Sequence, residues 1–148
     1  MSKIDIRDIW FDFAAAFVRK KDASGWDTLT SQEQEIAALW MLEADVYGGG
    51  FLQFFCNGGE EAYIYAVRAL QAIGAVHALE VIKSGYACIE HLSEDDRLTQ
   101  LWDIPKMLTE EETDLLDKLD KRFWEDQNRL AEIAHRYYVH QLGISSPS

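Results

Sequence analysis

With 148 residues, 48% of them hydrophobic, the chain can bury about two thirds of its unfolded surface, which predicts one compact globular domain over residues 1–148 and argues against a disordered acidic tail. Its 26 acidic residues outnumber 14 basic ones and give a net charge of −12, which argues against direct binding of nucleic acid or an anionic membrane and favours a basic protein surface as the partner. Two cysteines, and the lack of any stretch of roughly 20 apolar residues, predict a cytoplasmic protein with neither a disulfide framework nor a membrane span.

Most of the chain has the periodicity of amphipathic helices. In residues 6–17, apolar side chains recur at spacings of three and four, which predicts a first helix. Thr30 and Glu33 form a capping-box pattern that opens a second helix, which ends near Tyr47. Gly74 is the expected break before a later helix. The further helices are predicted over residues 51–57, 59–73 and 76–92.

The C-terminal part continues the helical pattern. Thr109 and Glu112 form another capping box, and the chain beyond them lacks Gly and Pro almost to its end. Residues 109–142 are therefore predicted to form one long amphipathic helix of about 50 Å, with residues 126–128 as the place for a bend. Since no strand pattern of useful length occurs, we predict an all-α fold of about six helices. The expected apolar side of the long helix consists of Leu115, Leu116, Leu119, Phe123, Leu130, Ile133, Ala134 and Tyr137.

A glycine-rich stretch, EADVYGGGFLQFFCNGG, occupies residues 43–59. Glu43 falls in the middle of an apolar helical stripe, where a carboxylate is costly unless it is hydrogen-bonded. We expect Glu43 to accept backbone N–H groups that follow the triple glycine, with Gly48 as the left-handed cap residue and Gln53 and Asn57 as further polar partners. A small anion or peptide pocket beneath the glycines is the functional alternative. The aromatic residues expected in the core are Phe51, Phe54 and Phe55.

Nothing in the sequence predicts catalysis. Glu132 and His135 form a single Glu-x-x-His pair on a helix, whereas a di-iron helical bundle needs two such pairs. Cys88 and His91 can share a helical face, but a zinc site needs further ligands. Because the hydrolase, zinc-protease and dinucleotide-binding motifs are also missing, we expect a protein that is not an enzyme, with no catalytic residue, metal or cofactor.

The stretch LEADVYGGGFLQFFCN resembles the signature of the bacterial DNA-mimic protein family, a domain of unknown function named after a protein that binds a helix-turn-helix transcription factor. The similarity covers most of the chain, from about residue 30 to about residue 140. The resemblance implies the fold of this family and, as a function, DNA mimicry. The chain departs from the signature at Gly48, where the family has Asn. The residues that match the signature are Asp45 and six others for which we expect a structural role: Glu43, Gly49, Gly50, Phe51, Gln53 and Asn57.

Acidic residues are concentrated between positions 90 and 126, where thirteen acids and five bases give −8 of the net charge of −12. Carboxylates at helical spacing lie about 5–6 Å apart at Cβ, comparable with the step between phosphates along a DNA strand. An acidic helix face can therefore copy part of a phosphate row, although Lys121 interrupts it. The alternative is that this face is simply exposed to solvent, and that its acids stabilise the helix by their interaction with its macrodipole. The candidate partner-binding residues are Asp95, Asp96, Glu110, Asp114, Asp117 and Glu125.

Two functions from different classes remain open. The protein is either a DNA mimic that occupies the basic surface of a transcription factor or other nucleic-acid-binding protein, or an immunity-type or antitoxin-type inhibitor of a basic toxin. A third interpretation is a small-ligand-binding helical protein whose pocket is lined by Trp40, Phe54 and Phe55. Each of these functions is compatible with a monomer or a homodimer.

Overall fold

The computed structural model describes residues 6–92, 95–125 and 127–142, and every regular element in these ranges is a helix, which confirms the predicted all-α fold. None of the described helices combines the length and the apolar character that a membrane span requires. The elements are, in chain order, α1 (Ile6–Ser24), η1 (Trp26–Thr28), α2 (Ser31–Ile73), α3 (Val76–Ile89), η2 (Glu90–Leu92), η3 (Leu101–Asp103), α4 (Ile104–Met107), α5 (Glu110–Trp124) and α6 (Gln127–Leu142).

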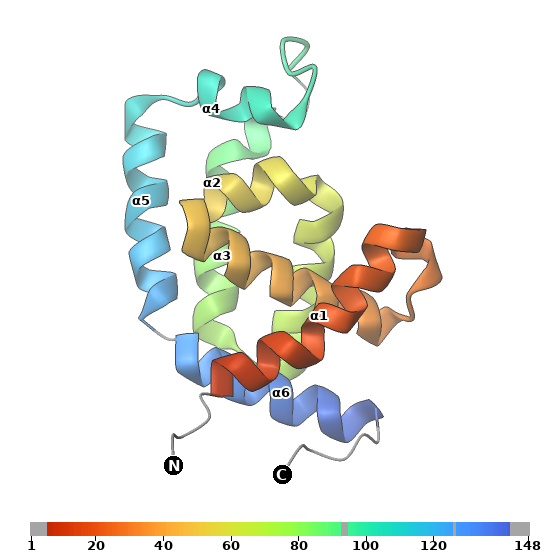
Figure 1. Ribbon diagram of the computed structural model, residues 1–148. Helices are drawn as coiled ribbons and strands as arrows, with labels where there is room; N and C mark the ends of the chain where they lie inside the picture. The colour runs from red at the N-terminus through yellow and green to blue at the C-terminus, as the bar shows by residue number, and fades with distance from the viewer. Residues whose placement is uncertain (1–5, 93–94, 126, 143–148) are drawn as a thin grey trace.

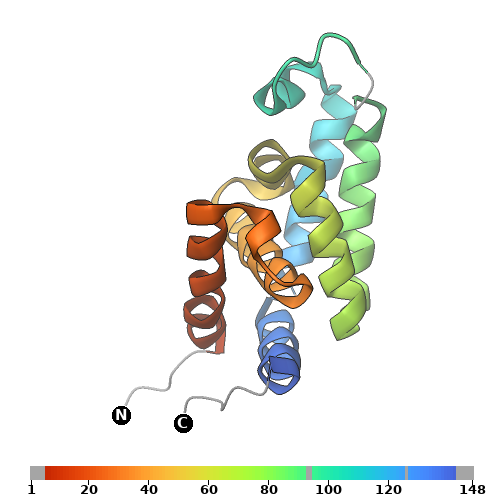
Figure 2. The same cartoon turned by 90° about the vertical axis from the view of Figure 1, so that its right-hand side faces the viewer.

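The helices are arranged around α2. On one side of the molecule α1 packs against α2 and α6, and on the other side α3 packs against α2 and α5. Figure 1 shows α6 across the bottom of the molecule and α5 along its left edge. The view in Figure 2 shows α3 and α5 running side by side. The short helices η3 and α4 lie at the upper end of this pair, where α5 begins (Figure 1).

Side-chain caps begin two helices where the sequence predicts them. The Thr30 hydroxyl accepts the Glu33 backbone N–H at 3.2 Å, and the Glu33 carboxylate accepts the Thr30 N–H at 2.9 Å. The same reciprocal pair joins Thr109 and Glu112, at 3.1 and 2.8 Å. Gly74, with φ 73°, ends α2 in the left-handed conformation that glycine adopts without strain. The two capping boxes and the break at Gly74 are therefore confirmed.

Two glycines inside α2 divide it into shorter helical stretches close to those that the sequence predicts. Gly50 has φ 84° and Gly59 has φ 63°, so both depart from helical geometry. The prediction that Gly48 is the left-handed residue is wrong, since Gly48 lies within the helix and the turn comes two residues later. The helical stretch after the turn begins at Phe51, whose N–H donates to Asp120 of α5, and this places the turn at Gly50. A Cβ on Gly50 would also collide with that carboxylate.

The C-terminal segment, predicted as one long helix with a bend, consists of two helices. α5 ends at Trp124 and α6 begins at Gln127, in the region where the sequence predicts a bend, and the two helices run in different directions (Figure 1). They also pack against different neighbours, α5 against α3 and α6 against α1. Leu115, predicted on the apolar side, is instead 46% exposed. It precedes the buried Leu116 by one residue, which is more than a quarter of a turn around the helix.

The core is rich in aromatic rings. Trp10 and Tyr138 are fully buried and stack with their ring centroids 6.2 Å apart, which joins α1 to α6. Phe51 meets Phe123 edge to face at 5.4 Å, which joins α2 to α5. Such pairs stabilise the fold beyond the burial of their apolar area. The predicted core residues after the triple glycine are confirmed, since no more than 1% of the surface is exposed in Phe51, Phe54 or Phe55.

Candidate functional site

One face of α5 carries the carboxylates that the sequence predicts there. The opposite face is buried through Leu116, Leu119 and Phe123, none of which is more than 3% exposed. With a rise of about 1.5 Å per residue, the carboxylates span about 22 Å of helix. Within the described residues, none of them forms an ion pair with a cation. We name as the acidic row the four exposed residues Glu110, Asp114, Asp117 and Glu125.

The loop before η3 holds the other two candidate partner-binding residues. Arg97 donates to the carboxylate of Asp95 through Nε at 3.1 Å and Nη2 at 2.8 Å. These hydrogen bonds lower the pKa of Asp95 to about 2. The charge of Asp95 is therefore already paired within the loop, whereas Asp96 is exposed. Of the two residues, Asp96 is the better placed to meet a partner.

His91 connects this loop with the first turn of α5. Its Nε2 lies 2.7 Å from Oε2 of Glu112, and the imidazole in its protonated form also lowers the pKa of Asp95. Glu112 caps α5, and its pKa is lowered chiefly by the hydrogen bond from the backbone N–H of Thr109. The structure thus brings the loop and the N-terminal end of the acidic row to the same end of the molecule, at the top of Figure 1.

The residues that match the signature are joined by internal hydrogen bonds. The carboxylate of Asp45 accepts from Gln53 Nε2 at 3.2 Å and from Asn57 Nδ2 at 3.1 Å. Desolvation raises the pKa of Asp45, and the two amides oppose that shift. Gly49 is exposed and Gly50 is buried. Because these bonds tie together the helical stretches before and after the glycine turn, they support the structural role expected of this segment.

Asp120, which is not among the candidate residues predicted from the sequence, completes this turn. Its Oδ1 accepts the backbone N–H of Phe51 at 2.8 Å, so it caps the helical stretch that starts there. Desolvation raises the pKa of this carboxyl group, the Phe51 N–H opposes the shift, and Asp117 adds to it. A sequence signal exists for Asp120: it lies four residues after Leu116 and three before Phe123, on the buried side of the helix.

Glu43 is buried, as predicted, with 4% of its surface exposed. Trp10 Nε1 donates to its Oε1 at 3.1 Å, so the carboxylate links α2 to α1. The prediction that Glu43 accepts the N–H groups after the glycines is wrong for Phe51, because Asp120 accepts that one. Helical periodicity places Glu43 on an inner face but does not show which neighbouring helix supplies its partner.

A comparison with protein-family models found that the model described as DMP19-like protein matches residues 27–141. The chain belongs to this family. The matched residues extend from η1 into α6 and include both the glycine turn and the acidic row. The match confirms the family resemblance seen in the sequence. No curated protein and no solved structure matched the chain.

Glu132 and His135, the pair considered as metal ligands, lie in different surroundings. Glu132 is exposed and accepts a hydrogen bond from Arg136 Nη2 at 2.6 Å, whereas His135 is buried against Phe13, with ring centroids 5.7 Å apart. Burial lowers the pKa of His135, so its neutral form is favoured. Among the residues that the structure describes, no three His, Cys, Asp or Glu side chains are grouped as they would be around a metal ion.

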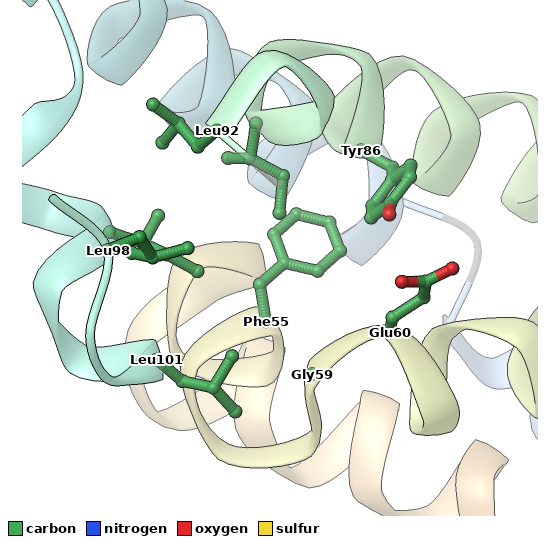
Figure 3. Close-up of a pocket in the computed structure, with 9 residues that line it drawn as sticks. Phe55, Gly59, Glu60, Tyr86, Leu92, Leu98 and Leu101 are labelled. Atoms are coloured by element: carbon green, nitrogen blue, oxygen red, sulfur yellow. The ribbon is translucent and has the colours of Figure 1, made fainter. Parts of the chain in front are cut away.

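A pocket of about 190 Å³ is lined by Leu92, Leu98 and Leu101, among other residues (Figure 3). Leu92 follows His91, which contacts Glu112, so the pocket lies at the same end of the molecule as the loop and the start of α5. Of the three residues predicted to line a ligand pocket, Phe55 lines this one. Phe54 is fully buried in the core, and Trp40 packs edge to face against Phe11 at 6.1 Å. The walls come from α2, from α3 with η2, and from residues 98–104, which are brought together only by the fold: Phe55, Gly59, Glu60, Tyr86, Ile89, Leu92, Leu98, Leu101 and Ile104.

Proposed function

We propose that the protein is an acidic protein-binding module that acts as a DNA mimic. In this role its acidic row occupies the basic surface of a transcription factor or other nucleic-acid-binding protein, and no catalytic residue, metal or cofactor takes part. The observation that carries the proposal is the row itself: exposed carboxylates on one side of a helix, none of them paired with a cation among the described residues. Membership of the DMP19-like family is consistent with a role of this kind.

The spacing of the row supports the proposal. Glu110, Asp114 and Asp117 follow one another at about 6 and 4.5 Å along the helix axis. Phosphates of one DNA strand rise by about 3.4 Å each, so the carboxylates are spaced between one and two phosphate steps. Lys121 interrupts the row, and Glu125 continues it about 12 Å beyond Asp117. The row is therefore a partial copy of a phosphate strand, densest at the start of α5.

The rigidity of α5 also supports the proposal. Its buried side packs on α2 and α3, and the hydrogen bond from the Phe51 N–H to Asp120 fixes the middle of the helix against the glycine turn. Carboxylates on such a helix keep their relative positions before a partner arrives, so little ordering of the backbone is needed on binding. Electrostatic complementarity of this kind mainly raises the rate of association.

A competition experiment tests the proposal. A partner is captured from native lysate at low salt, and the purified complex is titrated with duplex DNA. DNA should displace the protein, because both occupy the same basic surface, and added salt should weaken the complex steeply as the Debye length falls to about 8 Å at 0.15 M. A partner that does not bind DNA, in a complex that DNA leaves intact, would contradict DNA mimicry and favour the alternative of a toxin inhibitor.

A further inference from the structure

The pocket between α2, α3 and residues 98–104 is small and mostly apolar. The ring of Phe55 forms part of its wall, with Leu98 and Leu101 on one side and Tyr86 on the other (Figure 3). Its volume is about 190 Å³. A cavity of roughly 150 Å³ holds benzene, whereas ordinary small-molecule sites begin at about 300 Å³. The pocket therefore has room for one ring or one branched aliphatic group.

Negative charge surrounds the Tyr86 side of the pocket. Glu60 lines the pocket there (Figure 3). Glu90 follows Tyr86 by four residues, with its backbone N–H bonded to the Tyr86 carbonyl, so the two side chains lie on the same side of the helix. Burial raises the pKa of Tyr86, and the charges of Glu60 and Glu90 raise it further. Both carboxylates are exposed, and neither forms an ion pair with any residue that the structure describes. Tyr63 stacks on Tyr86 at 3.9 Å between ring centroids and adds aromatic surface, so a cation is favoured here.

The pocket adjoins the acidic end of the molecule. Leu92 in its wall directly follows His91, which contacts Glu112 in the first turn of α5. On the other side, Leu101 in its wall and the next residue, Trp102, are 39% and 53% exposed. Large apolar side chains at an open edge, next to unpaired carboxylates, are typical of the centre and rim of a protein interface.

We propose that this pocket receives an apolar side chain of the basic partner, of the size of Phe or Leu, with a Lys or Arg next to it that meets Glu60 and Glu90. This inference rests on the proposed function and adds to it an anchoring site beside the acidic row. The volume favours a single side chain over a free small molecule, and the unpaired carboxylates select a cationic neighbour. A few well-packed anchors of this kind supply most of the affinity of a protein interface, whereas exposed charges supply specificity and association rate.

Capped dipeptides test the chemistry of the pocket on the free protein. Acetyl-Phe-Lys-amide should bind about tenfold or more tighter than acetyl-Ala-Lys-amide, because only the first buries a ring. It should bind about two- to fivefold tighter than acetyl-Phe-Glu-amide, because only the first brings a cation to the carboxylates. NMR shifts of Tyr86 and Leu101 give the affinities. Equal binding of all three peptides, or no shift at the highest soluble concentration, would overturn the proposal. If phenethylammonium binds tenfold or more tighter than acetyl-Phe-Lys-amide, the pocket is a site for a small free amine, and the proposal is also overturned.

Matched variants connect the pocket with the partner. Leu101→Ala and Glu60→Gln should each weaken binding of acetyl-Phe-Lys-amide, whereas Leu115→Ala and Glu80→Gln, which make the same changes at exposed sites outside the pocket, should not. In the complex with the captured partner, Leu101→Ala should speed dissociation and leave the salt dependence unchanged. A dissociation rate equal to that of the wild type would refute the anchoring site without contradicting the role of the acidic row. If the dipeptides bind as expected but substitutions in the acidic row leave partner binding unchanged, the proposed function is refuted instead.

Discussion

Two substitutions of Asp120 separate its hydrogen bond from its charge. Asp120→Ala removes the acceptor of the Phe51 N–H, which Oδ1 holds at 2.8 Å. When a partly buried donor loses a charged acceptor, the free energy of unfolding falls by about 1–3 kcal/mol, so we expect the melting temperature to fall by about 3–10 °C. Asp120→Asn keeps an oxygen that can accept the same N–H, and we expect it to retain most of the stability at neutral pH.

The pH dependence of these variants follows from the raised pKa of Asp120. A carboxyl group whose pKa is raised in the folded state stabilises the fold fully below its ordinary pKa of 3.8. This contribution is lost as the pH rises through the higher folded value, because the folded protein then has to carry a desolvated charge. Asp120→Asn stays neutral, so its free energy of unfolding relative to the wild type should increase from about pH 4 to pH 7.

Urea unfolding followed by circular dichroism, at pH 4 and at pH 7, measures both effects. Asp114→Asn, an exposed position on the same helix, is the matched control for the loss of one charge. Asp120→Ala with wild-type stability would refute the assignment of Asp120 as the cap of the glycine turn. A constant difference between Asp120→Asn and the wild type across this pH range would refute the reasoning about its charge.

Three further predictions concern the stability of the fold, each measured as a free energy of unfolding in urea. Glu43→Ala leaves the buried Trp10 N–H without this acceptor and should cost about 1–3 kcal/mol; unchanged stability with lost partner binding would favour the anion or peptide pocket beneath the glycines. Tyr138→Phe removes the hydroxyl that donates to Glu35 at 2.9 Å and should cost about 1.5–3 kcal/mol, whereas no cost would mean that this buried bond is not needed. Thr109→Ala removes the cap of α5 and should cost about 1 kcal/mol, with Thr113→Ala as a control within the helix.

Local sequence patterns predicted most of the longer helices and the caps at three of their ends. The capping boxes at Thr30 and Thr109 need only residues three positions apart, and Gly74 ends its helix through its own conformation. The inner position of Glu43 follows from helical periodicity alone. The exposed positions of the acidic row on α5 follow from the same periodicity.

The partners of buried polar groups could not be predicted in this way, because they come from distant parts of the chain. The Phe51 N–H and Asp120 are 69 residues apart, and Tyr138 and Glu35 are 103 residues apart. Gly50 could not be chosen over Gly48 as the turn residue without knowing that Asp120 approaches there. The pocket around Phe55 escaped prediction for the same reason, since its walls come from three separate segments.

DNA mimicry requires that a particular row of carboxylates, and not bulk negative charge, binds the partner. The most direct test compares two triple variants with equal net charge: Glu110→Gln, Asp114→Asn and Asp117→Asn on α5, and Asp8→Asn, Asp12→Asn and Asp27→Asn, which are exposed residues in or near α1. The association rate with the captured partner is measured for both across a range of salt concentrations. We predict that only the first triple slows association, by roughly tenfold at low salt, and flattens its salt dependence. Equal losses of association rate in both triple variants would mean that only the net charge matters. An unchanged rate in the first triple variant would contradict binding through the acidic row.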